Sequence, residues 1–420
     1  MLFRVLLNLT LIFSTTFISV AQELKFSRPE SLKVSSNKLK LIDSLLHSVV
    51  DSGWVKGGEA LILKNGRIVY EKKFGKGLTP SPTTDNAIFR IASQTKPITS
   101  VAAMLLYERG QLLLNDPVSK YIPAFKSLRV LDGFNAKDST YTSINPIREV
   151  TILDLMTHTA GIEYGGPGSS QLSALYEKTS LPSEIVETRE FFEKEVLGRL
   201  LNLPLAHQPG AKFTYGYSTD ILGYLVEEIS GESLQDYFRN NIFSPFEMND
   251  TFFSLPKEKV DRLATVFTEH NKKTALWDYS AKVRVDYPLK KGLFFAGGEG
   301  ISTTTKDYAK FLQMLLDGGV YNGKRILSKS TIQLMMSNQI GNLEINGDKF
   351  GLGFMLTTSS GAQRRLGLSE GSFTWGGFFG TNSWADPKES LVGILFMQQW
   401  PLSHQEIFDK FKVLVYQSLK

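Results

Sequence analysis

The most informative part of this chain is the stretch FRIASQTKPITSVAAMLLYERG, residues 89–110. From Ile98 onward it is apolar on almost every side, as expected of a helix buried in the middle of a domain. Pro97 falls in the first turn, where most backbone N–H groups have no helical partner and where a fixed φ helps the helix to begin. The stretch therefore predicts a central helix that opens with Ser93 and Lys96.

Ser93 and Lys96 stand three residues apart, so they share one face of this helix. Both lie near the positive end of the helix dipole, whose field favours an alkoxide and disfavours a charged amine. The pair therefore suits a serine nucleophile beside a lysine that gives up its proton. The alternative is that Ser93 only caps the helix and that Lys96 is a solvated charge, and the stretch alone leaves both interpretations open.

The pattern Ser-x-x-Lys is not specific in itself, because it also occurs at residues 35–38 and 254–257. The first of these lies in a polar leader and the second in a predicted loop, so neither begins an apolar helix. The sequence has no His-Glu-x-x-His. Its five histidines are isolated from one another and it has no cysteine, so we expect neither a metal nor another cofactor.

The composition limits the class of protein. With 420 residues, 42% of them hydrophobic, the chain is long enough for one large domain or two lobes. Its formal net charge of +5 comes from 47 basic and 42 acidic residues that are scattered along the chain. Such a mildly basic, unpatterned surface is not typical of nucleic-acid-binding proteins. We therefore expect small-molecule substrates and no nucleic-acid partner, and the oligomeric state is left open.

Residues 1–21 have the three parts of a secretory signal: a basic residue, Arg4, then an apolar core, then small residues up to Ala21. We expect cleavage before Gln22 and export to the periplasm or the exterior of a bacterium, with no membrane association afterwards. The alternative is an uncleaved membrane anchor. No second apolar run of about 18 residues follows, so nothing else in the sequence predicts a membrane span.

The order of the predicted elements indicates how the chain is organised. Two β-prone runs flank Asn65-Gly66, which is the strongest short signal for a hairpin. Three more strand-like runs follow one another in residues 372–399, and residues 405–419 have the pattern of an amphipathic helix. The segments between these ends are largely helical, at 97–109, 151–157, 219–230, 233–240 and 306–316.

Strands at both ends of the chain, with helices between them, predict two lobes. An α/β lobe is built from residues 40–92 and 295–420, and a mainly helical lobe, residues 93–294, is inserted in it. The cleft between such lobes is the expected place of a functional site. Residues 163–180 are rich in glycine and serine and are expected to form a mobile loop near that cleft.

Several ordered motifs run through residues 40–400. The first is SQTKPITSVAAMLLYERGQLLLNDPVSKYIP, which contains Ser93 and Lys96. The others are MTHTAG at 156–161, PGAKFTYGYSTDILGYLVEEISG at 209–231, GGEGISTTTKDYAKFLQMLLDGG at 297–319, FGLGF at 350–354 and FTWGGFFGTNSWADP at 373–387. Together they resemble the serine β-lactamase and penicillin-binding-protein superfamily, in its branch of class C β-lactamases and family VIII carboxylesterases.

The resemblance implies one catalytic domain, residues 22–420, of the α/β class. Its fold would be β-lactamase/transpeptidase-like, with an antiparallel sheet flanked by helices and the mainly helical lobe inserted. His158, in the turn Thr-His-Thr-Ala-Gly, has the place of a structural residue in this family and is not assigned to a catalytic triad.

The second motif of that superfamily is Tyr-x-Asn, whose tyrosine is a general base. The corresponding residues here are Tyr215, Gly216 and Tyr217, so the tyrosine matches and Tyr217 stands in the place of the asparagine. In lactamases the asparagine helps to hold a side-chain carbonyl of the antibiotic, so its replacement argues against efficient lactam binding. The residues that follow, STDILG at 218–223, are similar to the esterase branch.

The third motif, Lys-Thr-Gly in lactamases, corresponds to Trp375, Gly376 and Gly377, which again resembles the esterases. Consecutive glycines on a strand let a substrate approach the backbone closely. The resemblance implies that the backbone N–H groups of Ser93 and Phe378 form an oxyanion hole. The missing lysine would pair with the carboxylate of a β-lactam or a D-Ala-D-Ala peptide, whereas Trp375 offers an apolar wall suited to an uncharged ester. Trp375 taken alone is equally explained as a core residue.

The resemblance thus implies an exported serine hydrolase, best described as a carboxylesterase for small uncharged esters. Ser93 attacks the ester carbonyl, Lys96 and Tyr215 share the role of base, and water then releases the acid. Free lysine and tyrosine side chains have pKa values of about 10.4 and 10, so the surroundings must lower at least one of them. The alternatives are a D-Ala-D-Ala-type peptidase, a class C-like β-lactamase, an acyltransferase, and a catalytically weak binding protein. The substrate is accordingly an ester, a lactam or a peptide.

Overall fold

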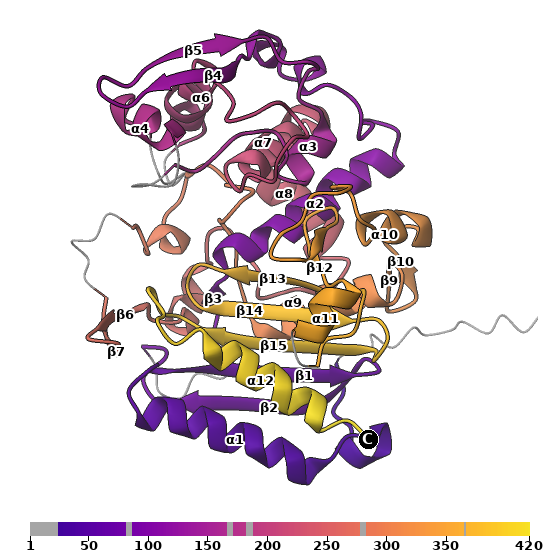
Figure 1. Cartoon of the computed structure of the whole chain (residues 1–420). Coiled ribbons are helices and arrows are strands. Elements are labelled where there is room, and N and C mark those ends of the chain that lie inside the picture. The colour runs from indigo at the N-terminus through magenta and orange to yellow at the C-terminus, as the bar shows by residue number, and fades with distance from the viewer. Residues whose placement is uncertain (1–23, 81–85, 166–170, 182–187, 278–282, 365–366) are drawn as a thin grey trace, which may run out of the picture.

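The computed structural model describes residues 24–80, 86–165, 171–181, 188–277, 283–364 and 367–420. The predicted signal segment, residues 1–21, lies outside the described residues, as do residues 166–170 of the predicted loop. The loop prediction for 163–180 is wrong in its second half, because Gln171–Lys178 forms the helix α4. One half of the molecule is a sheet covered by helices, and the other half is mainly helical (Figure 1). Within the described ranges, no helix combines the length and the apolar character needed to cross a membrane.

A seven-stranded antiparallel sheet is the frame of the first half. Its strand order is β11-β12-β13-β14-β15-β1-β2, so β15 from the end of the chain pairs directly with β1 from the beginning. The predicted hairpin at Asn65-Gly66 joins β1 to β2 and is confirmed, with φ values of 50° and 70° as a tight two-residue turn requires. The strands are β1 (Gly57–Lys64), β2 (Arg67–Gly75), β11 (Lys349–Phe350), β12 (Met355–Leu356), β13 (Phe373–Gly377), β14 (Thr381–Asp386) and β15 (Leu391–Met397).

Helices cover both faces of this sheet. On one face α1 (Ser36–Asp51) and α12 (Glu406–Gln417) pack against each other and against the sheet, over an apolar core of their own (Figure 1). On the other face α9 (Thr305–Leu316) packs on β1, β14 and β15. The Thr304 side chain caps α9 by accepting a hydrogen bond from the Asp307 N–H. The helices predicted at 306–316 and 405–419 are therefore confirmed, as is the α/β class.

The helical half is assembled around α2 (Thr95–Glu108) and α7 (Ser218–Ser230), which pack against each other. Residues 95–106 of α2 are all buried, as its apolar body predicts. The α3 helix (Ile152–Met156) and α8 (Leu234–Phe238) pack on α7. The other helices are α4 (Gln171–Lys178), α5 (Arg189–Phe191), α6 (Gly198–Leu201), α10 (Lys329–Met335) and α11 (Ser359–Arg364), with π-helical turns at Phe192–Leu197 and Arg239–Phe243 and 3-10 turns at Pro29–Leu32, Ala92–Gln94, Val118–Lys120, Pro123–Ser127, Lys257–Arg262 and Tyr287–Leu289.

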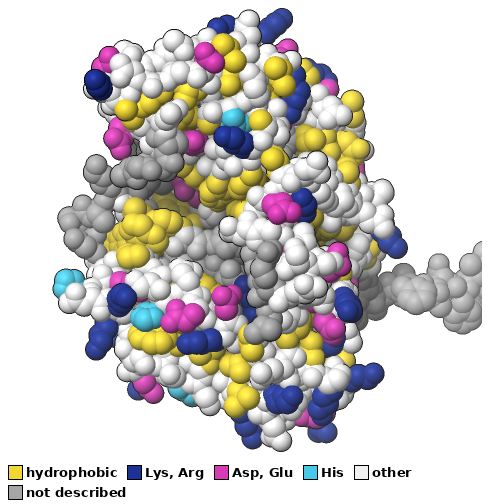
Figure 2. All heavy atoms as spheres, viewed as in Figure 1, with side chains coloured by type: hydrophobic (Ala, Val, Ile, Leu, Met, Phe, Trp, Pro, Cys, Tyr) yellow, Lys and Arg dark blue, Asp and Glu magenta, His cyan; other side chains and the backbone are white. Residues whose placement is uncertain are grey.

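Two-stranded ladders join segments that are distant in the sequence. The ladder of β3 (Phe89–Arg90) with β8 (Ser302–Thr303) places the residues before Ser93 beside the residues that follow Gly300. The other ladders are β4 (Val130–Asn135) with β5 (Thr140–Ile144), β6 (Phe267–His270) with β7 (Lys273–Leu276), and β9 (Val320–Tyr321) with β10 (Lys324–Arg325). Figure 2 shows basic and acidic side chains interspersed over the visible face, in agreement with the scattered charge of the sequence.

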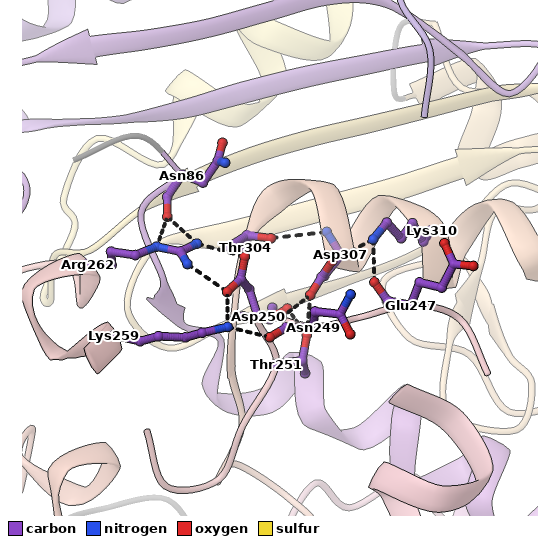
Figure 3. A network of polar contacts seen from close by, with 11 residues as sticks. Asn86, Glu247, Asn249, Asp250, Thr251, Lys259, Arg262, Thr304, Asp307 and Lys310 are labelled. Atoms are coloured by element: carbon purple, nitrogen blue, oxygen red, sulfur yellow. Dashed lines mark hydrogen bonds and ion pairs between the residues drawn. The ribbon is translucent and has the colours of Figure 1, made fainter. Parts of the chain in front are cut away.

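An ion network fixes the segment that follows α8 (Figure 3). Asp250 accepts two hydrogen bonds from the Arg262 guanidinium, at 2.7 and 2.8 Å, and one from Lys259 at 2.7 Å. Arg262 also donates to the Asn86 carbonyl, and the Asp307 carboxylate of α9 accepts the Asp250 N–H at 2.7 Å. Burial acts to raise the pKa of Asp250, but its two cationic partners outweigh burial and lower it. The network therefore ties this segment to α9.

Candidate functional site

Ser93 lies in the 3-10 turn Ala92–Gln94 immediately before α2, not inside the helix. The position is accessible enough for a substrate, since Ser93 is only partly buried and lines a cleft. Ala92 has a positive φ of 41°, which is uncommon for a residue with a side chain. Gln94 occupies the N-cap of α2 without a side-chain hydrogen bond, so the interpretation of Ser93 as a mere helix cap is wrong.

Lys96 is buried and 1% exposed, which excludes its interpretation as a solvated charge. Its Nζ donates hydrogen bonds to the Tyr164 hydroxyl at 2.9 Å and to the Gly298 carbonyl at 2.8 Å. The third partner of Nζ is Ser93 Oγ at 3.4 Å. The ammonium also lies 4.8 Å from the centre of the Tyr215 ring. The structure therefore brings Ser93, Lys96 and Tyr215 together.

A buried carboxylate, Asp220 of α7, lies behind the lysine. It accepts the Gly298 N–H at 2.8 Å and the Tyr164 hydroxyl at 3.3 Å. Burial raises the pKa of Asp220, while the positive charge of Lys96 acts in the opposite direction. Loss of contact with water, together with the negative charge of Asp220, raises the pKa of Tyr164. Tyr164 therefore keeps its proton, donates a hydrogen bond to Asp220 and accepts a hydrogen bond from Lys96.

Tyr215 is held by aromatic neighbours. Its ring centre lies 4.8 Å from that of His158, 5.5 Å from that of Tyr164 and 5.7 Å from that of Trp375. Burial and the charge of Lys96 keep the pKa of His158 well below its usual value, so this histidine is neutral. A neutral ring packed against Tyr215 agrees with the structural role expected for His158.

Two of the residues that differ from the lactamase motifs, Tyr217 and Trp375, lie behind the tyrosines of the cleft. Tyr217 is completely buried and packs edge-on against Tyr164, with ring centres 4.6 Å apart. Trp375 lies on β13 between Tyr215 and Phe350, whose ring centre is 5.3 Å from its own. Their direct contact with substrate stays a prediction, because the residues that line the cleft at this point are Tyr164 and Tyr215.

The end of β13 is brought next to the Ser93 turn by a glycine. A Cβ on Gly377 would lie 2.2 Å from the carbonyl oxygen of Ile91, two residues before Ser93. By contrast, a Cβ on Gly376 would meet its nearest neighbours at 3.4 Å. Glycine at 377 therefore allows the backbone at Phe378 to approach the serine, as an oxyanion hole requires. The role of the Phe378 and Ser93 N–H groups stays a prediction.

A cleft of about 540 Å³ opens beside Ser93. Tyr164 and Tyr215 form part of its wall, and the side chain of Phe378, which is 42% exposed, forms another part. Figure 2 shows hydrophobic side chains gathered at the level where the two halves of the molecule meet. Across the described ranges, no cluster of histidine and carboxylate side chains is suited to a metal ion.

Three residues in the surroundings of Lys96 were missed by the sequence interpretation. Tyr164 falls in the stretch that was expected to be a mobile loop, Asp220 is one of several acidic residues in a helix, and Gly298 acts only through its backbone. Their one sequence signal is that all three lie within or beside the family-like motifs.

Comparison with known proteins gives a consistent picture. The family model described as Beta-lactamase matches residues 42–416. Protein Rv1367c of Mycobacterium tuberculosis is 29% identical over 373 residues, 85% of this chain and 89% of that protein. Esterase EstB of Burkholderia gladioli is 25% identical over 362 residues, 82% and 86% of the two chains. Among solved structures, EstCE1, "a hydrolase with promiscuous acyltransferase activity", has a TM-score of 0.75 at 21% identity and covers 92% of this chain and 99% of its own. The expected fold is confirmed.

Proposed function

Because the chain belongs to the β-lactamase family, we propose that it is a serine hydrolase that cleaves carboxylic esters through an acyl-enzyme at Ser93. The observation that carries the proposal is the buried Nζ of Lys96, held at 3.4 Å from Ser93 Oγ by a tyrosine hydroxyl and a backbone carbonyl. A buried amine beside a partly accessible serine is the arrangement that activates a nucleophile.

The reaction follows from this arrangement in two halves. Ser93 Oγ attacks the ester carbonyl while Lys96 and Tyr215 take its proton, and the N–H groups of Ser93 and Phe378 stabilise the oxyanion. The alcohol leaves with the proton, and the acyl group stays on Ser93. A water molecule then attacks the acyl-serine, the same base takes the proton of the water, and the acid is released with the Ser93 hydroxyl restored.

The absence of two groups that would bind lactams and cell-wall peptides favours esters as substrates. The place of the lysine that would pair with a substrate carboxylate is taken by Trp375, and the place of the amide that would hold a lactam side chain is taken by Tyr217. The likeness to Esterase EstB supports the same choice. A D-Ala-D-Ala-type peptidase, a class C-like β-lactamase, an acyltransferase and a catalytically weak binding protein are the alternatives that the experiment below separates.

The test is turnover of p-nitrophenyl butyrate and of a chromogenic cephalosporin by the mature protein, each beside Ser93→Ala. We expect ester turnover that is lost in the variant, with little lactam turnover. A preference for the cephalosporin would reject the esterase in favour of a lactamase. Failure of both substrates, with no acyl adduct on Ser93 by mass spectrometry, would leave the binding protein as the better description.

Export is part of the proposal and rests on residues 1–21 alone. Cleavage before Gln22 would produce a periplasmic or secreted enzyme. N-terminal sequencing of protein from a cell fraction tests this directly, and an intact Met1 would contradict cleavage.

A further inference from the structure

The cleft beside Ser93 is larger and more aromatic than a small ester requires. A volume of about 540 Å³ has room for about 18 non-hydrogen atoms, if each needs about the 30 Å³ of a water molecule. The phenylalanine and tryptophan side chains that line it form what we call the aromatic pocket: Phe253, Phe294, Phe295, Phe378, Phe379 and Trp400.

Two members of the aromatic pocket can be placed relative to one of the proposed bases. Trp375, the first residue of the third motif, contacts Tyr215. Three residues further on, Phe378 stacks on Trp400, with ring centres 4.5 Å apart and planes inclined by 23°. Residues 375–377 belong to β13, where three residues of extended chain cover about 10 Å. Tyr215 and the Phe378–Trp400 pair therefore lie at opposite ends of this segment, and the Phe378 N–H proposed for the oxyanion hole lies at the second end.

This arrangement assigns the two parts of an ester to the two ends. In the proposed reaction the alcohol oxygen must receive a proton from Lys96 or Tyr215, so the alcohol lies at the Tyr215 end. The oxyanion faces the N–H of Phe378, and the remaining substituent of the carbonyl carbon is the acyl chain. We propose, resting on the proposed function, that the aromatic pocket binds this acyl chain and that the preferred substrates are esters of bulky, flat, uncharged carboxylic acids.

The charges in the cleft favour an acyl chain without a formal charge. Among the described residues that line the cleft, Arg284 and Glu299 are charged, and they have opposite signs. Arg284 is already beside a carboxylate, since its Nε lies 3.8 Å from Asp286 Oδ1. The Glu299 carboxylate would therefore repel an anionic acyl chain, and the Arg284 guanidinium is already engaged by Asp286.

The experiment varies the acyl and alcohol parts of the ester separately. The values of kcat/KM are measured for p-nitrophenyl acetate, p-nitrophenyl 3-phenylpropanoate and 2-naphthyl acetate. The variants are Trp400→Ala and Phe295→Ala, which shorten the aromatic pocket from two different segments. The control is Tyr141→Ala on β5, because Tyr141 is 40% exposed, close to the 36% of Trp400, and lies outside the cleft. Thermal unfolding of every variant shows that it is folded.

We expect the wild type to prefer phenylpropanoate to acetate by at least about tenfold, and this ratio to fall about tenfold in either pocket variant and to persist in the control. Two results would overturn the inference while the proposed function stands: Ser93-dependent ester turnover whose acyl preference neither variant changes, or a preference that follows the naphthyl alcohol instead. If no ester is turned over and Ser93 is not acylated, the proposed function fails, and the inference fails with it.

Discussion

Replacement of Tyr164 by phenylalanine removes one oxygen atom from the centre of the site. That oxygen accepts a hydrogen bond from Lys96 at 2.9 Å and donates one to Asp220 at 3.3 Å. Its loss leaves the ammonium that forms when Lys96 takes the Ser93 proton with one acceptor fewer. A hydrogen bond to a charged group contributes about 2 kcal/mol, which corresponds to about 30-fold in rate. We therefore expect kcat/KM for p-nitrophenyl butyrate to fall about 30-fold in Tyr164→Phe.

A matched control separates this role from simple packing. It is Tyr237→Phe, because the Tyr237 hydroxyl also accepts a hydrogen bond from a cation, Arg109, but away from the cleft, and this variant should keep its kcat/KM. The reasoning is refuted if Tyr164→Phe keeps kcat/KM within twofold of wild type, or if Tyr237→Phe loses as much.

Four further outcomes are expected. Ser93→Ala should lower ester turnover by about 10³-fold or more, measured at saturating substrate. Gly377→Ala should lower the thermal unfolding midpoint more than Gly376→Ala, because only the first places a Cβ at 2.2 Å from a backbone oxygen; equal midpoints would contradict the close approach. His158 is held neutral in the folded chain but takes up a proton near pH 6.5 when unfolded, so the free energy of unfolding should fall as the pH drops below about 6.5, and less steeply in His158→Gln. Asp250→Asn should lower the free energy of unfolding, measured in urea, by about 2 kcal/mol. Asp236→Asn, in an exposed ion pair, should lower it by less than about 0.5 kcal/mol, and similar losses in the two variants would show that the network adds no stability.

Local patterns in the sequence predicted the elements well. The apolar body of residues 95–106 and the Asn65-Gly66 turn each depend on neighbours within a few residues, so periodicity and turn chemistry are sufficient to find them. The same holds for the start of α9, where Thr304 caps the helix. Ser93 was expected inside the helix and lies in a separate turn before it, because the boundary depends on the positive φ of Ala92, which no local pattern indicates.

The surroundings of Lys96 could not be predicted in the same way. Tyr164 comes from a loop, Asp220 from α7, and Gly298 from the segment before β8, so their meeting depends on packing between both halves of the molecule. Tyr217 is buried and packs behind Tyr164, so the predicted contact of Tyr217 with substrate stays a prediction.

One peptide segment binds both Asp220 and Lys96 in this site. Gly298 donates its N–H to Asp220 and offers its carbonyl to Lys96, and the residues on either side of it, Phe294–Ala296 and Glu299–Gly300, form part of the wall of the cleft. A Cβ at position 298 would lie 2.5 Å from the Asp220 carboxylate, so only glycine fits there. In the proposed reaction, a substrate that displaces this wall would also displace the carbonyl that holds Lys96, the proposed base. Substitutions that change the range of substrates should therefore also change the turnover rate. A variant selected for a wider cleft should need a compensating change near Asp220.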